Sequence, residues 1–166
     1  MRDIEFRGKR IDNGEWVTGF YVHYDDTKDN HKDDCDYIVG IHTGEHFPFF
    51  EVIPETVGQY TGLDDKCGNK IFEGDIVKHH DFGKTEYTSV VKFGEYEQDG
   101  SDGEYAPTEC IGFYVEVKSY FVLYYSGDWE PCPYLLQRNL LEVAKSCEVI
   151  GNIHDNPELL KEIDKE

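Results

Sequence analysis

Positive charge is the scarcest feature of this sequence. Lys and Arg number 16 against 35 Asp and Glu, which gives a net charge of −19 at pH 7. A surface of this kind repels phosphate backbones and anionic membranes, so we expect no direct binding to nucleic acid and no membrane association. The acidity either keeps the protein in solution or forms a surface that imitates nucleic acid and docks on a basic partner.

Long hydrophobic runs are also missing. The opening segment, MRDIEFRGKR, has no apolar stretch like that of a secretion signal, and no later run reaches membrane-spanning length. We therefore expect a soluble, cytoplasmic protein. The cysteines form an odd, scattered set without a CxxC pair, which predicts free thiols. They are Cys35, Cys67, Cys110, Cys132 and Cys147.

What the sequence does contain points to β structure. Hydrophobic residues make up 39% of the 166 residues, and aromatic residues, at 14%, supply much of what can be buried. Aromatic rings pack well on pleated sheets. We predict a mainly β protein with a compact, barrel-like antiparallel architecture and short helical elements near the C-terminus. The length fits a single domain over 1–166, with two β subdomains meeting near 54–80 as the alternative arrangement.

Turn signals divide the chain into predicted strands. IEFRGKRI (4–11) and WVTGFYVHY (16–24) flank an Asn13-Gly14 pair, which predicts a hairpin closed by a tight type I′ turn. Towards the C-terminus, Leu136, Leu140, Val143 and Cys147 fall on one helical face, which indicates a short helix over 135–144. Further strands are expected over 37–42, 49–53, 87–97, 111–125 and 147–154.

The segment VGQYTGLDDKCGNKIFEGDIVK (57–78) could be a glycine-rich site or a pair of tight turns. A phosphate-binding loop needs glycines that lead into a helix N-terminus, followed by Gly-Lys-Ser or Gly-Lys-Thr. Here the glycines lead into β-branched and aromatic residues. We therefore predict that Gly68, Gly74 and Asp75 are architectural, with a glycine at positive φ and Asp75 bonded to backbone amides.

The histidines suggest a metal site, but their spacing does not support one. His42 and His46 occur in HTGEH, His79 and His80 are adjacent, and Cys35 could add a thiolate. A His-x3-His pair serves a metal when a helix places both rings on one face, and the surrounding pattern is β. We expect loop histidines, and we assign no catalytic, cofactor-binding or metal-binding residue.

Two weaker candidates have simpler interpretations. The acidic run 25–36, DDTKDNHKDDCD, lacks the central Gly and the closing Glu of a calcium loop, so we expect a solvated loop. Cys67 lies on a turn beside Lys66, but no His or Asn is recognisably tied to it as a nucleophile requires.

Three blocks of the sequence resemble the YopX family, whose members are encoded by phages and prophages. They read IEFRGKRIDNGEWVTGF (4–20), VIPETVGQYTGLDDKCGNKIFEGDIVK (52–78) and EVIGNIHDNPELL (148–160). The resemblance implies a mostly β protein with barrel-like packing and a tendency to self-associate, and it implies no enzymatic activity, cofactor or catalytic residue. Members usually carry a polar residue where this chain has Cys67, which weakens a catalytic role for that thiol.

Two functional hypotheses follow. In the first, the chain is a non-enzymatic phage or prophage protein, an acidic binding or assembly module for a host or phage protein that also forms a homo-oligomer. In the alternative, it is an enzyme that modifies a small molecule or nucleotide with His and carboxylate residues near 42–46 and 73–80. Histidines gathered in a deep pocket favour the enzyme, and histidines dispersed over exposed loops favour the module.

Overall fold

Antiparallel strands dominate the computed structural model, as the composition predicts. It describes residues 3–24, 35–40, 47–81, 85–98, 106–123, 129–131 and 137–160. The chain divides into two compact units, here called unit 1 (Met1–Gly62) and unit 2 (Leu63–Glu166). Both units are built mainly from antiparallel sheet.

Unit 1 contains a sheet in the order β4-β3-β2-β1-β5. A 3-10 turn, η1 (Pro54–Thr56), leads into β5, which continues into unit 2 and pairs there with β6. The strands are β1 (Phe6–Lys9), β2 (Trp16–Tyr24), β3 (Cys35–Val39), β4 (Phe49–Glu51) and β5 (Gly58–Asp64).

Val52, which follows β4, also joins this strand to the residue after β1 and to the start of β3. Val52 forms an isolated antiparallel bridge with Arg10, and its amide donates to the Asp36 carbonyl at 2.9 Å. Gly8 permits this close approach, because a Cβ at that position would lie 3.0 Å from the Val52 side chain. The sheet order itself is open, so the predicted barrel stays a prediction.

The first hairpin has a longer loop than the sequence indicates. The Arg10 amide donates to the Glu15 carbonyl at 2.9 Å, which leaves residues 11–14 in the loop. Gly14 takes the left-handed conformation (φ +73°), and the Asn13 side chain accepts a hydrogen bond from the Glu15 amide. The predicted type I′ turn is therefore wrong. The Asn13 side-chain bond and Gly14 serve a wider turn instead of a two-residue one.

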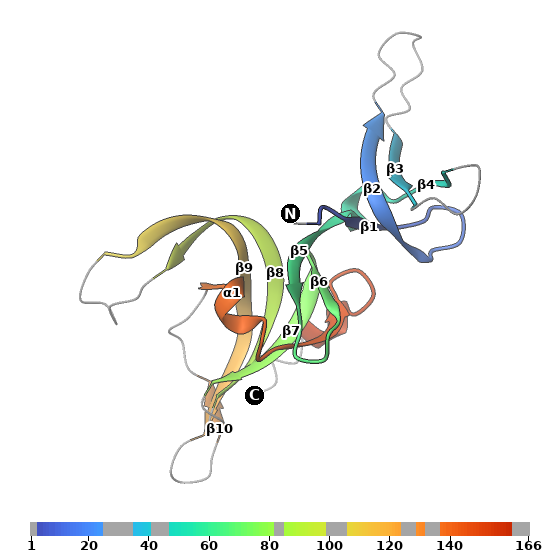
Figure 1. Ribbon diagram of the computed structural model, residues 1–166. Helices are drawn as coiled ribbons and strands as arrows, with labels where there is room; N and C mark the ends of the chain where they lie inside the picture. Colours follow the sequence, from blue (N-terminus) through green and yellow to red (C-terminus); the bar gives the residue numbers. More distant parts are fainter. Residues whose placement is uncertain are drawn as a thin grey trace. The chain divides into compact units, whose positions relative to one another are not determined.

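Unit 2 contains a second sheet in the order β10-β9-β8-β7-β12, with β11 also paired to β9. In Figure 1, β8 and β9 run beside each other as long curved ribbons, with α1 next to β9. The strands are β6 (Lys70–Phe72), β7 (Asp75–Asp81), β8 (Thr85–Gln98), β9 (Thr108–Leu123), β10 (Trp129–Pro131), β11 (Gln137–Asn139) and β12 (Glu148–Asn152). The helical elements are α1 (Leu140–Val143) and the 3-10 turn η2 (Pro157–Leu160).

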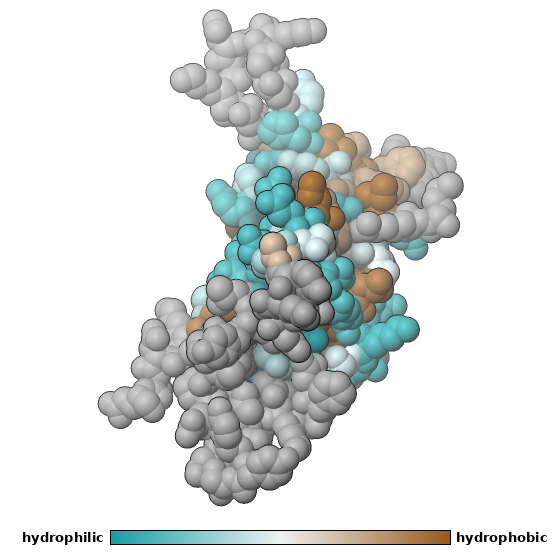
Figure 2. All heavy atoms as spheres, turned by 90° about the vertical axis from the view of Figure 1, so that its left-hand side faces the viewer, coloured by the Kyte–Doolittle hydropathy of each residue, from teal (hydrophilic) through white to brown (hydrophobic). Residues whose placement is uncertain are grey.

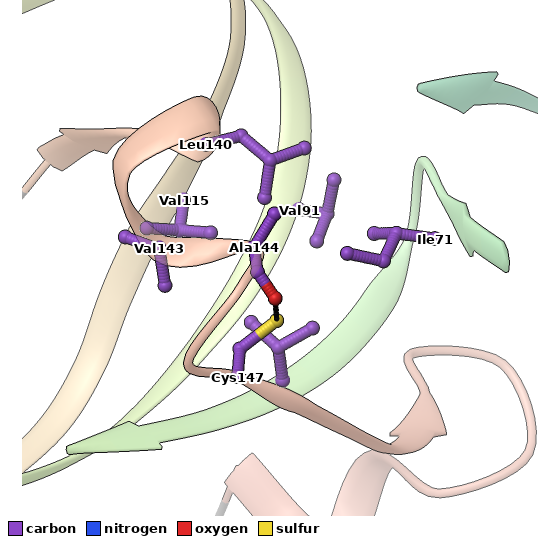
Figure 3. Packing of buried hydrophobic residues seen from close by; sticks show 8 residues of the cluster. Ile71, Val91, Val115, Leu140, Val143, Ala144 and Cys147 are labelled. Carbon is purple, nitrogen blue, oxygen red and sulfur yellow. Dashed lines mark hydrogen bonds between the residues drawn. The ribbon is translucent and has the colours of Figure 1, made fainter. Parts of the chain in front are cut away.

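The core of unit 2 joins these strands to the helix. Leu140 and Val143 are fully buried against strand residues, and the Cys147 thiol donates to the Ala144 carbonyl at 3.3 Å (Figure 3). Burying such a side chain stabilises the fold by about 1.5–3 kcal/mol. The cluster contains Ile71, Val77, Val91, Val115, Leu140, Val143, Ala144 and Cys147.

Of the predicted helical face, Leu140, Val143 and Cys147 are buried together in the core, and Leu136 lies outside the described residues. The helix itself is shorter than predicted, covering Leu140–Val143. It begins at Leu140 because the Asn139 side chain caps it, accepting a hydrogen bond from the Leu141 amide at 2.8 Å. Residues 137–139 form β11 instead, since they pair with β9. Tertiary pairing has overridden the local helical pattern there.

Candidate interaction surface

The glycine-rich segment is architectural, as predicted. Gly68 and Gly74 both have positive φ, at +85° and +82°, and both lie in turns between strands. Asp75 is fully buried, and its carboxylate accepts a hydrogen bond from the Phe72 amide at 2.7 Å. Gly68 lies in the turn between β5 and β6, and Gly74 and Asp75 close the turn between β6 and β7, so the fold explains all three residues.

Asp65, in the same segment, has a structural role that the sequence did not predict. Its buried carboxylate accepts hydrogen bonds from the amides of Cys67 and Asn69, each at 2.8 Å, and from the Val149 amide at 3.0 Å. Burial raises the pKa of Asp65, but the bonds from Val149, Asn69 and Cys67 outweigh burial and lower it overall. The carboxylate thus fastens the turn after β5 to the start of β12.

His79 is a core residue and not a loop histidine. It lies in β7 with no exposed surface, stacks on the Tyr87 ring at a centroid distance of 4.7 Å, and contacts the Ser89 hydroxyl at 3.2 Å through Nε2. The predicted loop placement is therefore wrong for His79. It failed because an alternating strand can bury one histidine of an adjacent pair. His42, His46 and the side chain of His80 lie outside the described residues.

The other sequence candidates are not brought together. Cys67 is exposed in its turn, and of the acidic run only residues 35 and 36 fall within the described ranges. Within those ranges, no three His, Cys, Asp or Glu side chains gather in a way that could hold a metal ion. Nor is any helix there long and apolar enough to cross a membrane.

Sequence reasoning missed a hydrogen-bonded cluster on one face of β2 and β3. The buried Asp36 carboxylate accepts from the Tyr21 hydroxyl at 2.5 Å and contacts His23 Nδ1 at 2.9 Å. The hydrogen bond to Asp36 raises the pKa of Tyr21 to about 12. His23 and Asp36 are directly opposite in the ladder, so the cluster fixes the register of the two strands.

The opposite face of the same strands is apolar and open to solvent. Alternation along β2 places Phe20, Val22 and Tyr24 on this side, with exposed fractions of 57%, 41% and 56%. Phe49 of β4, 64% exposed, is opposite Val39. Cross-strand pairing then completes what we call the aromatic face: Phe20, Val22, Tyr24, Tyr37, Val39 and Phe49.

Few charges accompany the aromatic face. The register places Arg7 and Lys9 of β1 on the same side of the sheet as Phe20, and Glu51 of β4 on the same side as Tyr37. Arg7 lies over the Trp16 ring, with Cζ 4.8 Å from its centroid. Within the paired positions of β1 to β4, this side of the sheet carries Glu51 against Arg7 and Lys9, although the net charge of the chain is −19.

A signal for this surface is present in the sequence. Aromatic and β-branched residues occupy every second position from Trp16 to Tyr24, but Val17 and Tyr21 interrupt the simple contrast between an apolar and a polar side. Because both sides contain apolar residues, periodicity could not say which side was exposed. Figure 2 shows hydrophobic residues, in brown, at the molecular surface among hydrophilic ones.

The fold and this surface define a mainly β protein of two sheet-containing units with an exposed aromatic face. The model of the YopX protein family matches residues 5–161, so the chain belongs to the YopX family. Protein EF1440 from Enterococcus faecalis, known from a crystal structure, is 21% identical, with 96% of this chain and 99% of that chain covered and a TM-score of 0.41. No curated protein matches the chain significantly.

Proposed function

We propose that this YopX-family chain is a non-enzymatic assembly module encoded by a phage or prophage. Copies associate through the aromatic face of unit 1, and the acidic surface remains available for a host or phage protein in the bacterial cytoplasm. The observation that carries the proposal is the exposure of Phe20, Val22 and Tyr24 of β2 and of Phe49 of β4, on the two strands that flank β3. Contiguous exposed apolar groups of this kind are typical of protein–protein contact sites.

The distribution of charge supports a second copy as the occupant of this face. Two chains that each carry a net charge of −19 repel one another, so contact is least unfavourable where carboxylates are few. In a two-fold arrangement the same patch serves both copies. Arg7 and Lys9, on the β1 side of the face, can then approach Glu51 on the β4 side of the other copy.

The enzyme alternative has less support from the described residues. His79, one of its proposed catalytic groups, is fully buried and packed against Tyr87, and Asp75 is fully buried in a turn. A general acid or base must reach a substrate proton, and neither side chain is placed at the surface. Their contacts are those of residues that hold strands together.

Sedimentation velocity tests the proposal with the native chain and a Phe20→Ser/Phe49→Ser double variant. We expect native self-association that strengthens with added salt, because screening weakens the repulsion between acidic surfaces. The double variant should sediment as a monomer. Phe93→Ser, at a residue of unit 2 that is 55% exposed, is the matched control and should associate like the native chain. A native monomer at high concentration would overturn the proposal.

A further inference from the structure

A second exposed apolar surface lies on the long β8–β9 hairpin of unit 2. The register pairs Phe93 with Phe113, Glu95 with Ile111, and Glu97 with Glu109. Directly paired residues of an antiparallel ladder share a face, and so do residues two apart along a strand. These pairs form one surface, here called the hairpin face: Phe93, Glu95, Glu97, Glu109, Ile111 and Phe113.

The apolar part of the hairpin face is exposed, and its aromatic residues are supported by the core of unit 2. Ile111 is 75% exposed and Phe93 is 55% exposed. The Phe93 and Phe113 rings meet edge to face at 5.0 Å, and Phe113 packs against the core cluster of unit 2. An anchor supported in this way is ordered before a partner arrives, so less conformational entropy is lost on binding.

The charged part of the hairpin face has a single sign. Glu95, Glu97 and Glu109 are all exposed, and Glu97 stands directly opposite Glu109. Like charges in that position destabilise a ladder. No ion pair within the described ranges involves these residues.

Glu116 of β9, unlike the three glutamates of the hairpin face, forms ion pairs. Its carboxylate is paired with Lys92 and with Lys118. Those three side chains lie on the other face of the hairpin, because their positions alternate with those of Phe93 and Ile111. The cations of β8 and β9 therefore neutralise one face and leave the hairpin face acidic.

We propose that the hairpin face binds an extended basic segment of another protein. An apolar side chain of that segment covers Phe93 and Ile111, while Lys or Arg residues at alternate positions meet Glu95, Glu97 and Glu109. A cation can also lie over the exposed Phe93 ring. This inference rests on the part of the proposed function that gives the chain a protein partner, and it is separate from self-association through the aromatic face.

Charge selects this occupant over the alternatives. Nucleic acid and anionic lipid would bring phosphates against the hairpin carboxylates, which repel them. A second copy would bring an equally acidic hairpin face. A basic segment gains both the apolar contact and relief of the repulsion between Glu97 and Glu109.

Fluorescence anisotropy with labelled model peptides tests this inference. The probes are an octapeptide of alternating Lys and Leu, one of alternating Glu and Leu, and one of Lys and Ser. We expect the Lys-Leu peptide to bind at least about tenfold more tightly than either of the others, and its affinity to fall as salt rises. Equal binding of the Lys-Ser peptide would overturn the role of Phe93 and Ile111.

Variants of the full chain locate the site. Phe93→Ser/Ile111→Ser and the triple change Glu95→Gln/Glu97→Gln/Glu109→Gln should each weaken Lys-Leu binding about tenfold. The control triple changes the net charge equally at exposed residues elsewhere and should bind like the native chain: Asp3→Asn/Glu55→Gln/Glu158→Gln. Loss of binding in the control, or unchanged binding in both hairpin variants, would overturn the inference, as would tighter binding of duplex DNA than of the Lys-Leu peptide.

Sedimentation of the same variants separates this inference from the proposed function. The hairpin variants should keep native self-association, and Phe20→Ser/Phe49→Ser should keep native peptide affinity. A monomeric native chain that binds the Lys-Leu peptide through Glu95 and Ile111 would refute the assembly proposal and support this one. Unchanged circular dichroism in each variant shows that loss of binding is not loss of fold.

Discussion

The Asp65 carboxylate and the Val149 amide, 84 residues apart in the chain, are joined by a 3.0 Å hydrogen bond. The same carboxylate also holds the amides of Cys67 and Asn69. A buried charged acceptor with several donors is costly to lose, because each donor left without a partner keeps its desolvation penalty. Asp65 therefore stabilises unit 2 at two places.

Replacing Asp65 by Ala should lower the free energy of unfolding of unit 2 by about 3 kcal/mol, because hydrogen bonds to charged groups contribute about 1.5–3 kcal/mol each and do not add fully. Urea denaturation measures this change, and hydrogen exchange should show the Val149 amide losing protection. Asp64→Ala, at the exposed neighbouring residue, is the control. Equal stability of the two variants would contradict the role given to Asp65.

Acid should weaken unit 2 through the same carboxylate. The pKa of Asp65 in the folded chain is below its ordinary value of 3.8, so its contribution to stability is present above that pH and is lost as the pH falls through the folded pKa. The free energy of unfolding of the native chain should therefore fall on acidification below about pH 5. The Asp65→Ala variant should show a shallower fall. Parallel curves for the two proteins would exclude this contribution.

Gly74→Val should destabilise the fold by about 1–3 kcal/mol, because a β-branched residue at φ +82° is strained. Space is not the problem, since an added Cβ would meet the Ile153 side chain at an ordinary 3.7 Å. Gly112→Val is the control, because its φ is not left-handed and an added Cβ meets nothing within 4 Å. Thermal unfolding of both variants measures the loss of stability. An unchanged melting temperature for Gly74→Val would contradict the predicted backbone strain.

The Tyr21 hydroxyl should resist ionisation until high pH. Its hydrogen bond to Asp36 raises the pKa of Tyr21 to about 12, so its contribution to stability is complete below the ordinary pKa of 10 and is lost as the pH rises through 12. Ultraviolet titration of Asp36→Asn should show one more tyrosine ionising near the ordinary pKa than in the native chain. Identical titration curves would show that the two side chains are uncoupled.

The thiols should differ sharply in reactivity. Burial is the main cause that raises the pKa of Cys147 to about 11, whereas Cys67 is exposed. A disulfide reagent at pH 8 should modify Cys67 rapidly and Cys147 only after unfolding. After denaturation without reductant, all five cysteines of the sequence should react. A shortfall would indicate disulfides and contradict the cytoplasmic expectation.

Duplex DNA should not bind at physiological salt, because the net charge of −19 repels phosphates. Fluorescence anisotropy with a labelled duplex measures this directly. Micromolar affinity would contradict the prediction and would point to the cations near the aromatic face. Arg7→Gln/Lys9→Gln would then identify them by abolishing the binding.

What the sequence could predict was local. The sequence predicted the Gly74–Asp75 turn because this turn depends only on residues a few positions apart. These are a glycine at positive φ and an Asp that bonds a nearby amide. The bond from Val149 to Asp65 was not readable, because nothing in the sequence near residue 65 indicates which distant amide will reach it. Long-range pairing also explains why the helix is shorter than predicted, since residues 137–139 pair with β9 as a strand.

The candidate surfaces were less predictable than the fold. The alternation of Phe20, Val22 and Tyr24 predicts a strand whichever side faces solvent, and exposure depends on what covers each side. The sequence does not distinguish the environment of His79 from that of His80, but in the structure β7 buries His79 beside Tyr87. The grouping of Glu95, Glu97 and Glu109 with Ile111 required the register of β8 and β9, which the sequence does not specify.

The two units differ in how much of the chain must be synthesised before each of them can fold on the ribosome. Unit 1 can form the Arg10–Val52 bridge and its paired strands once residue 62 has emerged. Unit 2 must wait for Leu140, Val143 and Cys147 to fill its core, and for β12 to cover the edge of β7. Until then the nascent chain presents a strand edge and an uncovered apolar cluster, the features that recruit chaperones and favour aggregation. Slow translation over residues 63–152 should therefore lower the yield of folded protein more than slow translation before residue 62.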